Sequence, residues 1–379
     1  MRLLHTSDWH VGRTFHGRDL LVEQEAVLGG LADLVSDEKV DVVAVSGDLF
    51  DRAVPNPEAV AVCARVLERV RSAGARVVIT PGNHDSAARL GLFGGFAAAG
   101  GLHLRTKVAE LHQPVLLADA HGPVAVYGIP FLEPDTARHA LGVEARGHAA
   151  VLTEAMRRVR ADLAARGGRS VVLAHAFVTG GEPCESERTI AVGGVQDVPG
   201  AVFDGIDYVA LGHLHGQQTL AEHLRYSGSP VAYSFSEARH VKSVWLAELD
   251  ASGLSGVERR LLPVPRELSA LSGELEDLVL DPAHTPVEEH FLSVVLTDRV
   301  RPLDALRRLQ VRFPHAVRVE WRPEGGRDTE LRFAERVRGR SDEEIACCFL
   351  EDVRGEPPAG RELELLREAI SAAAREGDS

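Results

Sequence analysis

Short runs of consecutive apolar residues recur through the first two thirds of the chain, and most end in glycine or a polar residue. Runs of this length followed by such residues predict buried strands that open into loops. The four clearest runs lie at residues 3–4, 42–45, 77–79 and 208–211. Further strands are predicted at residues 124–130, 170–174, 224–227 and 243–249.

Helical periodicity separates several of these strands, at residues 20–35 and 153–166 among others. The best-marked helix begins after Asn56, a favourable N-cap, has Pro57 in its first turn and ends before Gly74. Strands that alternate with helices predict a layered α/β architecture.

Pro263 and Pro265 interrupt the pattern and predict a domain boundary. We therefore expect a first domain at residues 1–265 and a small β-α-β domain at residues 266–325. The elements expected in the small domain are strands at 290–298 and 316–321 and a helix at 302–311.

Residues 326–379 form a polar tail with two predicted helices, at 342–350 and 361–374. Apolar positions on these helices, such as Phe349 and Leu366, can form stripes. Such stripes pack either on a partner or on the chain's own body, and the sequence leaves both alternatives open.

The composition is that of an ordinary globular protein, with 45% hydrophobic and 26% charged residues. No apolar run approaches the roughly 18 residues of a membrane span, and the start of the chain lacks a secretory signal pattern. We therefore expect a cytoplasmic protein without a membrane segment. The cysteines lack CxxC spacing and are expected to be reduced structural thiols: Cys63, Cys184, Cys347 and Cys348.

Residue types that bind metals follow the predicted strands. They occur in Asp8-Trp9-His10, Gly47-Asp48, Gly82-Asn83-His84-Asp85 and Gly212-His213-Leu214-His215, and His175 follows a fifth strand. Because strand carboxyl ends form the usual ligand crevice of an open α/β sheet, we expect these side chains to lie together. Asp8 and His10 are expected to face one metal because alternate residues of a strand point the same way.

The expected chemistry is hydrolysis of a phosphodiester. This reaction needs charge neutralisation and a hydroxide at neutral pH, and two divalent ions about 3.5–4 Å apart supply both. Mixed oxygen and nitrogen ligands suit ions such as manganese.

The same stretches resemble the signature of the calcineurin-like metallophosphoesterases, a family whose fold is a sandwich of two β-sheets flanked by helices. The resemblance covers residues 1–265 and rests on HTSDWH (5–10), SGDLFD (46–51), PGNHD (81–85), LAH (173–175) and LGHLH (211–215). The flanking strings HTSDWHVG and RYSGSPVAYSF (225–235) further resemble the SbcD family, the nuclease subunits of SbcC–SbcD double-strand-break repair complexes.

Carried over position by position, the resemblance implies two metal sites that share Asp48. One metal would be held by Asp8, His10, Asp48 and His215, and the other by Asp48, Asn83, His175 and His213. His84 would lie over the scissile phosphate without binding metal, and Asp85 would orient its imidazole. The role of Asp51, in support of the site or of its loop, stays open.

Neighbouring residues are assigned structural roles. His5 is expected to anchor its strand and Trp9 to pack beside the cleft. Gly228-Ser229-Pro230 is expected to form a tight turn, with support of the metal site as the second alternative. The glycine-containing connection at residues 178–205 either faces substrate or is a tolerated surface loop.

The resemblance implies a manganese-dependent DNA exonuclease and endonuclease for repair, recombination and replication. Its implied partner is an SbcC-type coiled-coil ATPase that docks on the tail, and it would form a homodimer within a heterotetramer. The small domain would be a capping domain that positions duplex DNA. A net charge of −14 opposes binding of DNA by this chain alone, so we expect the partner to supply many of the contacts with DNA. A phosphatase or phosphodiesterase for a small substrate and a mainly architectural DNA-end tether remain as alternatives.

Overall fold

The computed structural model describes residues 1–191, 197–323, 339–354 and 356–377. They fall into two compact units, Met1–Pro265 and Arg266–Ser379.

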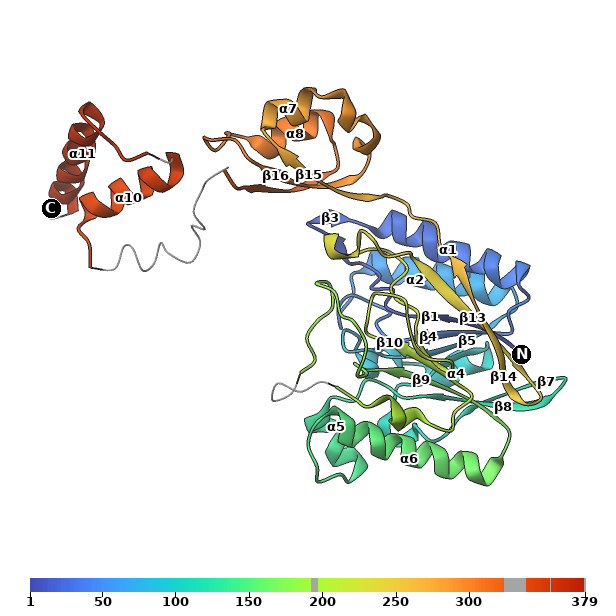
Figure 1. Cartoon of the computed structure of the whole chain (residues 1–379). Helices are drawn as coiled ribbons and strands as arrows, with labels where there is room; N and C mark the ends of the chain where they lie inside the picture. The colour runs from blue at the N-terminus through green and yellow to red at the C-terminus, as the bar shows by residue number, and fades with distance from the viewer. Residues whose placement is uncertain (192–196, 324–338, 355, 378–379) are drawn as a thin grey trace. The chain divides into compact units, whose positions relative to one another are not determined.

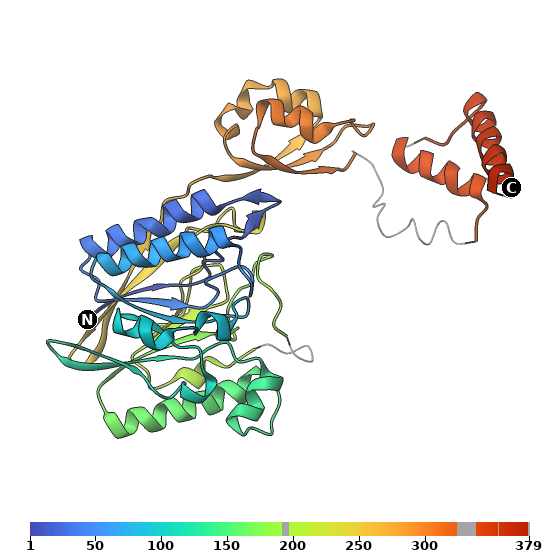
Figure 2. The same ribbon diagram turned by 180° about the vertical axis from the view of Figure 1, so that it is seen from behind.

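Two six-stranded sheets form the centre of the first unit (Figures 1 and 2). The first sheet contains, in spatial order, β14 (Gly253–Leu261), β13 (Ser243–Asp250), β1 (Arg2–Thr6), β4 (Val42–Ser46), β5 (Arg76–Thr80) and β6 (Leu102–Leu104). The second contains β11 (Gln218–Ala221), β12 (Leu224–Tyr226), β10 (Tyr208–Gly212), β9 (Arg169–His175), β8 (Gly122–Gly128) and β7 (Val115–Asp119).

Strands β1, β4, β5 and β6 run parallel in the first sheet, as do β8, β9, β10 and β12 in the second. Of these, β4, β9 and β10 are buried along their whole length. Strands buried on both faces carry continuous apolar runs, which is why the sequence pattern marks them. One apolar core joins the facing sides of the two sheets and includes Val42, Ala44, Val78, Val126, Val171, Leu173 and Tyr208.

Helices cover the outer faces of both sheets (Figures 1 and 2). On the side of the first sheet lie α1 (Leu21–Asp37) and α2 (Pro57–Ser72), and on the side of the second lie α5 (Pro134–Leu141) and α6 (His148–Arg166). Asn56 caps α2, since its Oδ1 accepts from the Ala59 backbone N–H at 2.7 Å. The expected layered α/β fold, with two sheets flanked by helices, is confirmed.

Several local expectations need correction. Helix α6 begins at His148, five residues before the predicted start at 153, and Gly147 ahead of it provides no side-chain cap. Glu133-Pro134-Asp135, which resembles a turn, instead starts α5, with Glu133 as its N-cap. Strands β6, β7, β11 and β14 were not predicted. The glycine-rich segment at residues 91–101, for which the sequence predicts a loop or a short helix, contains α4 (Gly94–Ala99), and α3 (Ala87–Leu90) precedes it.

The second unit contains one more β-α repeat than the sequence predicted. Its sheet has three parallel strands, β15 (Leu268–Gly273), β16 (Phe291–Leu296) and β17 (Ala316–Trp321), with α7 (Leu275–Leu280) and α8 (Ala305–Arg312) between them. Strand β15 has no fully buried residue, so its sequence lacks the apolar run that marks the other two. Leu275 and Leu278 of α7 complete the core beneath Leu292 and Val294.

The expected tail helices are present as α10 (Asp342–Arg354) and α11 (Arg361–Gly377). Arg367 of α11 donates to Glu343 of α10 at 2.7 Å, so the two helices contact each other. Residues 326–338 of the tail lie outside the described residues. All four cysteines are free. Within the described ranges, none of the helices combines the length and apolarity needed to cross a membrane.

Candidate metal centre

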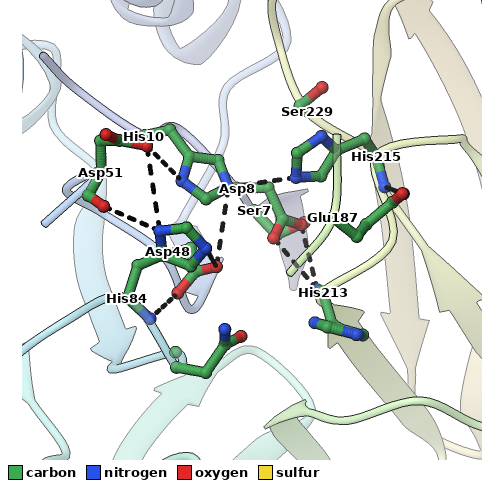
Figure 3. Close-up of polar contacts among 12 residues, drawn as sticks. Ser7, Asp8, His10, Asp48, Asp51, His84, Glu187, His213, His215 and Ser229 are labelled. Carbon is green, nitrogen blue, oxygen red and sulfur yellow. Dashed lines mark hydrogen bonds and ion pairs between the residues drawn. The ribbon is translucent and has the colours of Figure 1, made fainter. Parts of the chain in front are cut away.

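The predicted ligands lie together at one edge of the two sheets. Figure 3 labels Asp8, His10, Asp48, His213 and His215 among them. Loops after β1, β4 and β5 supply residues from the first sheet, and the ends of β9 and β10 supply residues from the second. The two sheets approach closely here, because His175 Nδ1 at the end of β9 donates to the Ser46 carbonyl of β4 at 2.9 Å. The close approach of the two sheets therefore builds the site.

Left-handed backbone conformations aim several of these side chains. Asp8, His10, Asp48 and His213 have φ values of 52°, 43°, 51° and 109°. Such values are uncommon outside glycine and cluster at functional sites. Strand β1 ends at Thr6, so alternation along a strand does not bring Asp8 and His10 to one side, as the sequence argument assumed. Turns beyond the strand end do so.

One group of possible ligands consists of Asp8, His10 and His215, whose ligand atoms lie within 4.8 Å of one another. The Nε2 atoms of His10 and His215 are 3.1 Å apart. Two neighbouring nitrogens bound to one ion at about 2.1 Å each are about 3 Å apart. The observed spacing therefore fits a shared metal ion.

A second group consists of Asp8, Asp48 and His175. Asp48 Oδ2 lies 3.4 Å from His175 Nε2 and 3.6 Å from His10 Nε2. It is thus between an imidazole of each group, the position required of a bridging carboxylate. Asn83 Oδ1 approaches His175 Nε2 at 2.9 Å.

His213 belongs to the same cluster through its ring and its backbone. Its ring centroid is 5.4 Å from that of His175. Its backbone N–H donates to both Asp8 oxygens at 3.1 Å. All seven predicted ligands therefore lie at one place, although the sequence separates Asp8 from His215 by most of the first unit.

The cluster contains two buried acids that have only imidazoles as nearby bases within the described structure. Asp8 and Asp48 are 0% and 2% exposed, and the ion-pair partners of Asp48 in the described structure are histidines. Burial raises the pKa of Asp8 to about 6. Burial opposes ionisation of Asp48 too, but the charge of His175 holds its pKa well below the usual value.

The imidazoles divide into one charged and several neutral groups. Burial opposes the charged form of His175, but Asp48 outweighs it and raises its pKa to about 9. Burial lowers the pKa of His213 to about 3 and that of His10 well below its usual value. Neutral imidazoles have the lone pair that a metal requires.

Two buried polar atoms of the described cluster, His10 Nδ1 and Asn83 Nδ2, lack a hydrogen-bond partner. Two acids, an amide and four imidazoles in this environment fit a pair of divalent cations, whose charge offsets that of the acids.

His84 is adjacent to the cluster and 6% exposed. Its Nε2 lies 3.9 Å from Asp48 Oδ2, and its backbone N–H donates to Asp48 Oδ1 at 2.8 Å. Its Nδ1 donates to the Asp51 carbonyl at 2.7 Å. The main chain of Asp51 therefore orients this imidazole.

Asp85 does not orient His84, contrary to the sequence-based expectation. Its carboxylate instead accepts backbone N–H groups of Leu49, Phe50 and Gly82, each at 3.0 Å. Burial raises its pKa to about 7. Asp85 thus joins the loop after β4 to the loop after β5, which positions Asp48 and Asn83 through the backbone.

The neighbouring residues behave as expected in two cases. His5 is buried between the Tyr208 hydroxyl at 2.9 Å and the Leu211 carbonyl at 3.0 Å, and so anchors β1 to β10. Trp9 is 1% exposed and donates to Thr6 Oγ1, which leaves no ring face for a base. At residues 228–230, where a tight turn was the first expectation, the Ser229 backbone N–H donates to the His215 carbonyl at 3.1 Å, so this segment supports the site, as the second alternative holds.

Sequence reasoning missed the polar residues that support the cluster. Gln24 of α1 donates to the His10 carbonyl at 2.9 Å and accepts from the Gly12 N–H. Ser186, Glu187, Glu237 and Lys242 surround His215. The available signal was weak: Gln24 is a polar residue on the apolar face of a helix, and Ser186 lies in a connection flagged only for its length.

Known proteins resemble this chain in sequence and in structure. The family model described as calcineurin-like phosphoesterase matches residues 1–217. Similar solved structures include TT1561 of Thermus thermophilus, at 14% identity over 68% of this chain and 98% of its own, with a TM-score of 0.40. YfkN from Bacillus subtilis is 15% identical over 69% of this chain and 90% of its own, with a TM-score of 0.37. GAP50 of Plasmodium is 11% identical over 86% of this chain and 98% of its own, with a TM-score of 0.40.

Proposed function

The chain belongs to the calcineurin-like phosphoesterase family, and from that premise we propose that it is an SbcD-like, two-metal DNA nuclease. Its substrate would be a DNA phosphodiester, its metal manganese, and its activities those of an exonuclease and endonuclease in DNA end processing. The observation that carries the hydrolytic part is that the seven predicted ligands lie together, with Asp48 next to imidazoles of both groups. The DNA substrate is supported by the string at residues 225–235 and by the second unit.

The residues of the site have different proposed roles in hydrolysis. Asp8, His10, Asp48 and His215 would hold one divalent ion, and Asp48, Asn83, His175 and His213 the other. Such ions, when bound, neutralise phosphate charge and make a hydroxide available near neutral pH. His84 Nδ1 donates a hydrogen bond to the Asp51 carbonyl, so Nε2 is the ring nitrogen that would contact the phosphate. Because Nδ1 carries a proton, Nε2 is protonated only in the imidazolium, and burial lowers the pKa of His84 while the Asp48 carboxylate opposes that shift. In the imidazolium form, Nε2 would stabilise charge on the leaving oxygen or give it a proton.

We further propose a homodimer that contacts through the segment after the PGNHD motif. Leu92, Phe93 and Phe96 are 63%, 68% and 82% exposed. Three large apolar side chains exposed within five residues are typical of a protein contact surface.

The tail is proposed to dock an SbcC-type coiled-coil ATPase. Phe349 of α10 and Leu365 of α11 are 54% and 49% exposed, as an apolar docking surface requires. The partner would also compensate for the net charge of −14 in DNA binding. We place this complex in the cytoplasm.

The test compares two substrates and two variants. Purified protein with Mn²⁺ is incubated with linear duplex DNA and, separately, with an aryl phosphodiester, in the presence and absence of the co-purifying ATPase. We expect cleavage of both, and a fall of about 10²–10⁴ in kcat for His84→Ala with metal content unchanged. The exposed His121→Ala is the matched control and should keep its activity.

Two outcomes would contradict the proposal. Cleavage of the aryl phosphodiester but not of DNA, with or without the ATPase, would favour the small-substrate enzyme. Full DNA cleavage by His84→Ala would favour the architectural tether and remove His84 from the mechanism.

A further inference from the structure

His215 is held at three of its four polar groups by neighbouring residues. Its backbone N–H donates to Glu187 Oε1 at 2.7 Å. Its carbonyl accepts from the Ser229 N–H at 3.1 Å and from Lys242 Nζ at 3.2 Å. Its Nδ1 meets Ser186 Oγ at 2.7 Å. Nε2, the remaining group, faces the cluster.

A buried chain of polar side chains continues from Ser186. Its Oγ donates to Glu237 Oε1 at 2.6 Å, and Glu237 Oε2 pairs with Lys242 Nζ at 2.5 Å. The side chains of Glu237 and Lys242 are 0% and 5% exposed. Burying such a pair usually brings no net stability over an apolar pair, so stability alone does not account for it.

The direction of these hydrogen bonds fixes the tautomer of His215. An ionised carboxylate only accepts, so the Ser186 hydroxyl gives its proton to Glu237. The Ser186 oxygen must then accept from His215, which places a proton on Nδ1. The lone pair of His215 is therefore on Nε2, 3.1 Å from His10 Nε2.

We propose that Ser186 is a positioning residue for the metal ligand His215, and that the Glu237–Lys242 pair sets the direction of its hydroxyl. This inference rests on the proposed two-metal function. It assigns a role to the described part of the connection at 178–205: this segment supports a ligand. A hydrogen bond to the outer nitrogen of a ligating histidine fixes its orientation and tautomer.

The segment that carries Ser186 is itself fastened to the site. Arg13 Nη2 donates to the Ser186 carbonyl at 2.6 Å. The Arg13 backbone N–H in turn donates to the His10 carbonyl at 2.9 Å. The Glu185 N–H donates to Ser236 Oγ at 3.1 Å, beside Glu237. Ser186 is thus tied to the turns that bear both His10 and Glu237.

The first test needs no metal. Nitrogen-15 NMR of histidine side chains in the metal-free full chain reports which nitrogen of His215 is protonated, with His215→Gln used for assignment. We expect the Nδ1–H form in the wild type, a mixture of tautomers in Ser186→Ala, and the wild-type form in Ser186→Thr, which keeps the hydroxyl. The Nε2–H form in the wild type, or an unchanged spectrum in Ser186→Ala, would overturn the proposal.

The second test measures Mn²⁺ affinity by calorimetry. Ser186→Ala should weaken the binding of one of the two Mn²⁺ ions by about 10–100-fold. In a His215→Ala background, the same substitution should cause no further loss of affinity. Ser170→Ala, which removes another buried hydroxyl that donates to Asp207 rather than bonding a histidine, should bind as the wild type does. An equal loss with and without His215 would overturn the proposal, since Ser186 would then act on the fold. A wild type that binds no Mn²⁺ would instead overturn the proposed function, and the NMR result would still decide the tautomer.

Discussion

At the scale of single residues, the site combines features that oppose stability elsewhere in proteins. Asp8 and Asp48 are buried acids, and both have left-handed backbone conformations that cost of order 1 kcal/mol or more in residues other than glycine. The surrounding hydrogen bonds maintain this arrangement. A pair of cations would convert the unfavourable burial of acids into favourable binding, because the ions supply the opposite charge.

Metal binding should release protons, because His175 is protonated at neutral pH in the metal-free protein. Asp48 raises its pKa to about 9, and a ligand must be deprotonated. We expect release of about one proton per chain near pH 7.5, and an affinity for Mn²⁺ that rises up to about tenfold per pH unit between about pH 7 and pH 9. Calorimetry in two buffers with different ionisation enthalpies measures this number. Binding without proton release would show that His175 is not a protonated ligand in the free protein.

At the scale of elements, the close approach of β10 to β4 determines where the ligands are. A Cβ at Gly212 would lie 1.8 Å from the Ser46 carbonyl oxygen and 2.9 Å from His175 Nδ1. The same carbonyl accepts the hydrogen bond of His175. A glycine at the end of β10 is therefore a requirement of the packing between the two sheets.

Gly212→Ala should push the two strands apart and displace His175 and His213. We expect a loss of about 1–3 kcal/mol in the free energy of unfolding and an affinity for Mn²⁺ weakened more than tenfold. Gly30→Ala is the matched control, since a Cβ there meets no atom within 4 Å. In the middle of α1 it should stabilise by about 0.5–1 kcal/mol. Urea unfolding of the metal-free proteins tests both, and equal stability of Gly212→Ala and the wild type would contradict the packing argument.

Arg169, at the opposite end of β9 from His175, joins several strands. Its guanidinium donates to both Asp119 oxygens at 2.6 and 2.9 Å and to the Gly122 carbonyl at 2.7 Å. It also donates to the Asp250 carbonyl at 3.1 Å. It thereby ties β9 to the β7–β8 hairpin and to the end of β13.

Arg169→Met should destabilise the protein by about 3–5 kcal/mol, because Asp119 loses both hydrogen bonds from the guanidinium and keeps the Met1 ammonium and the His121 backbone N–H as partners. The Arg169 hydrogen bonds lower the pKa of Asp119, so this contribution is present above its ordinary pKa and is lost on acidification. The difference from wild type should therefore persist down to about pH 4 and shrink below it. Arg157→Met, which breaks an ion pair whose arginine is 65% exposed, should cost less than about 1 kcal/mol. A difference that grows below pH 4 would argue against this role for Asp119.

At the scale of the whole molecule, the candidate metal centre and the part proposed to select the substrate lie in different units. All residues of the metal centre lie in the unit Met1–Pro265, whereas Arg266–Ser379 has its own core around Leu292, Leu309 and Phe313. The first unit therefore contains the chemistry that the family shares. The second unit is the part proposed to direct that chemistry to DNA and to the ATPase.

A chain that ends at Pro265 should keep its Mn²⁺ affinity and its hydrolysis of an aryl phosphodiester to within about threefold, since no metal ligand is removed. Its cleavage of duplex DNA with the ATPase should fall at least tenfold. Parallel assays of both substrates on the full and shortened chains measure this ratio. Unchanged DNA cleavage would remove the second unit from substrate recognition.

The sequence by itself determined the features that depend on local patterns. The buried strands were recognisable because strands covered on both faces need continuous apolar runs. The predicted bounds 316–321 match β17, and the apolar run at 77–79 lies within β5. Asn56 and Pro57 marked the start of α2, since capping depends on adjacent residues. The metal-binding residue types could also be recognised in the sequence, because each of the five groups follows a different strand.

Only the tertiary structure decided how these residues are aimed and supported. Asp85 bonds backbone groups rather than His84, and Ser186 reaches Glu237 across 51 residues. Strand β15 lacks an apolar run because it is partly exposed, so only its pairing with β16 reveals it. The physical reason is the same in each case: a hydrogen bond or a strand pairing between distant segments leaves no periodic mark on either one, and exists only once the chain has brought the segments together.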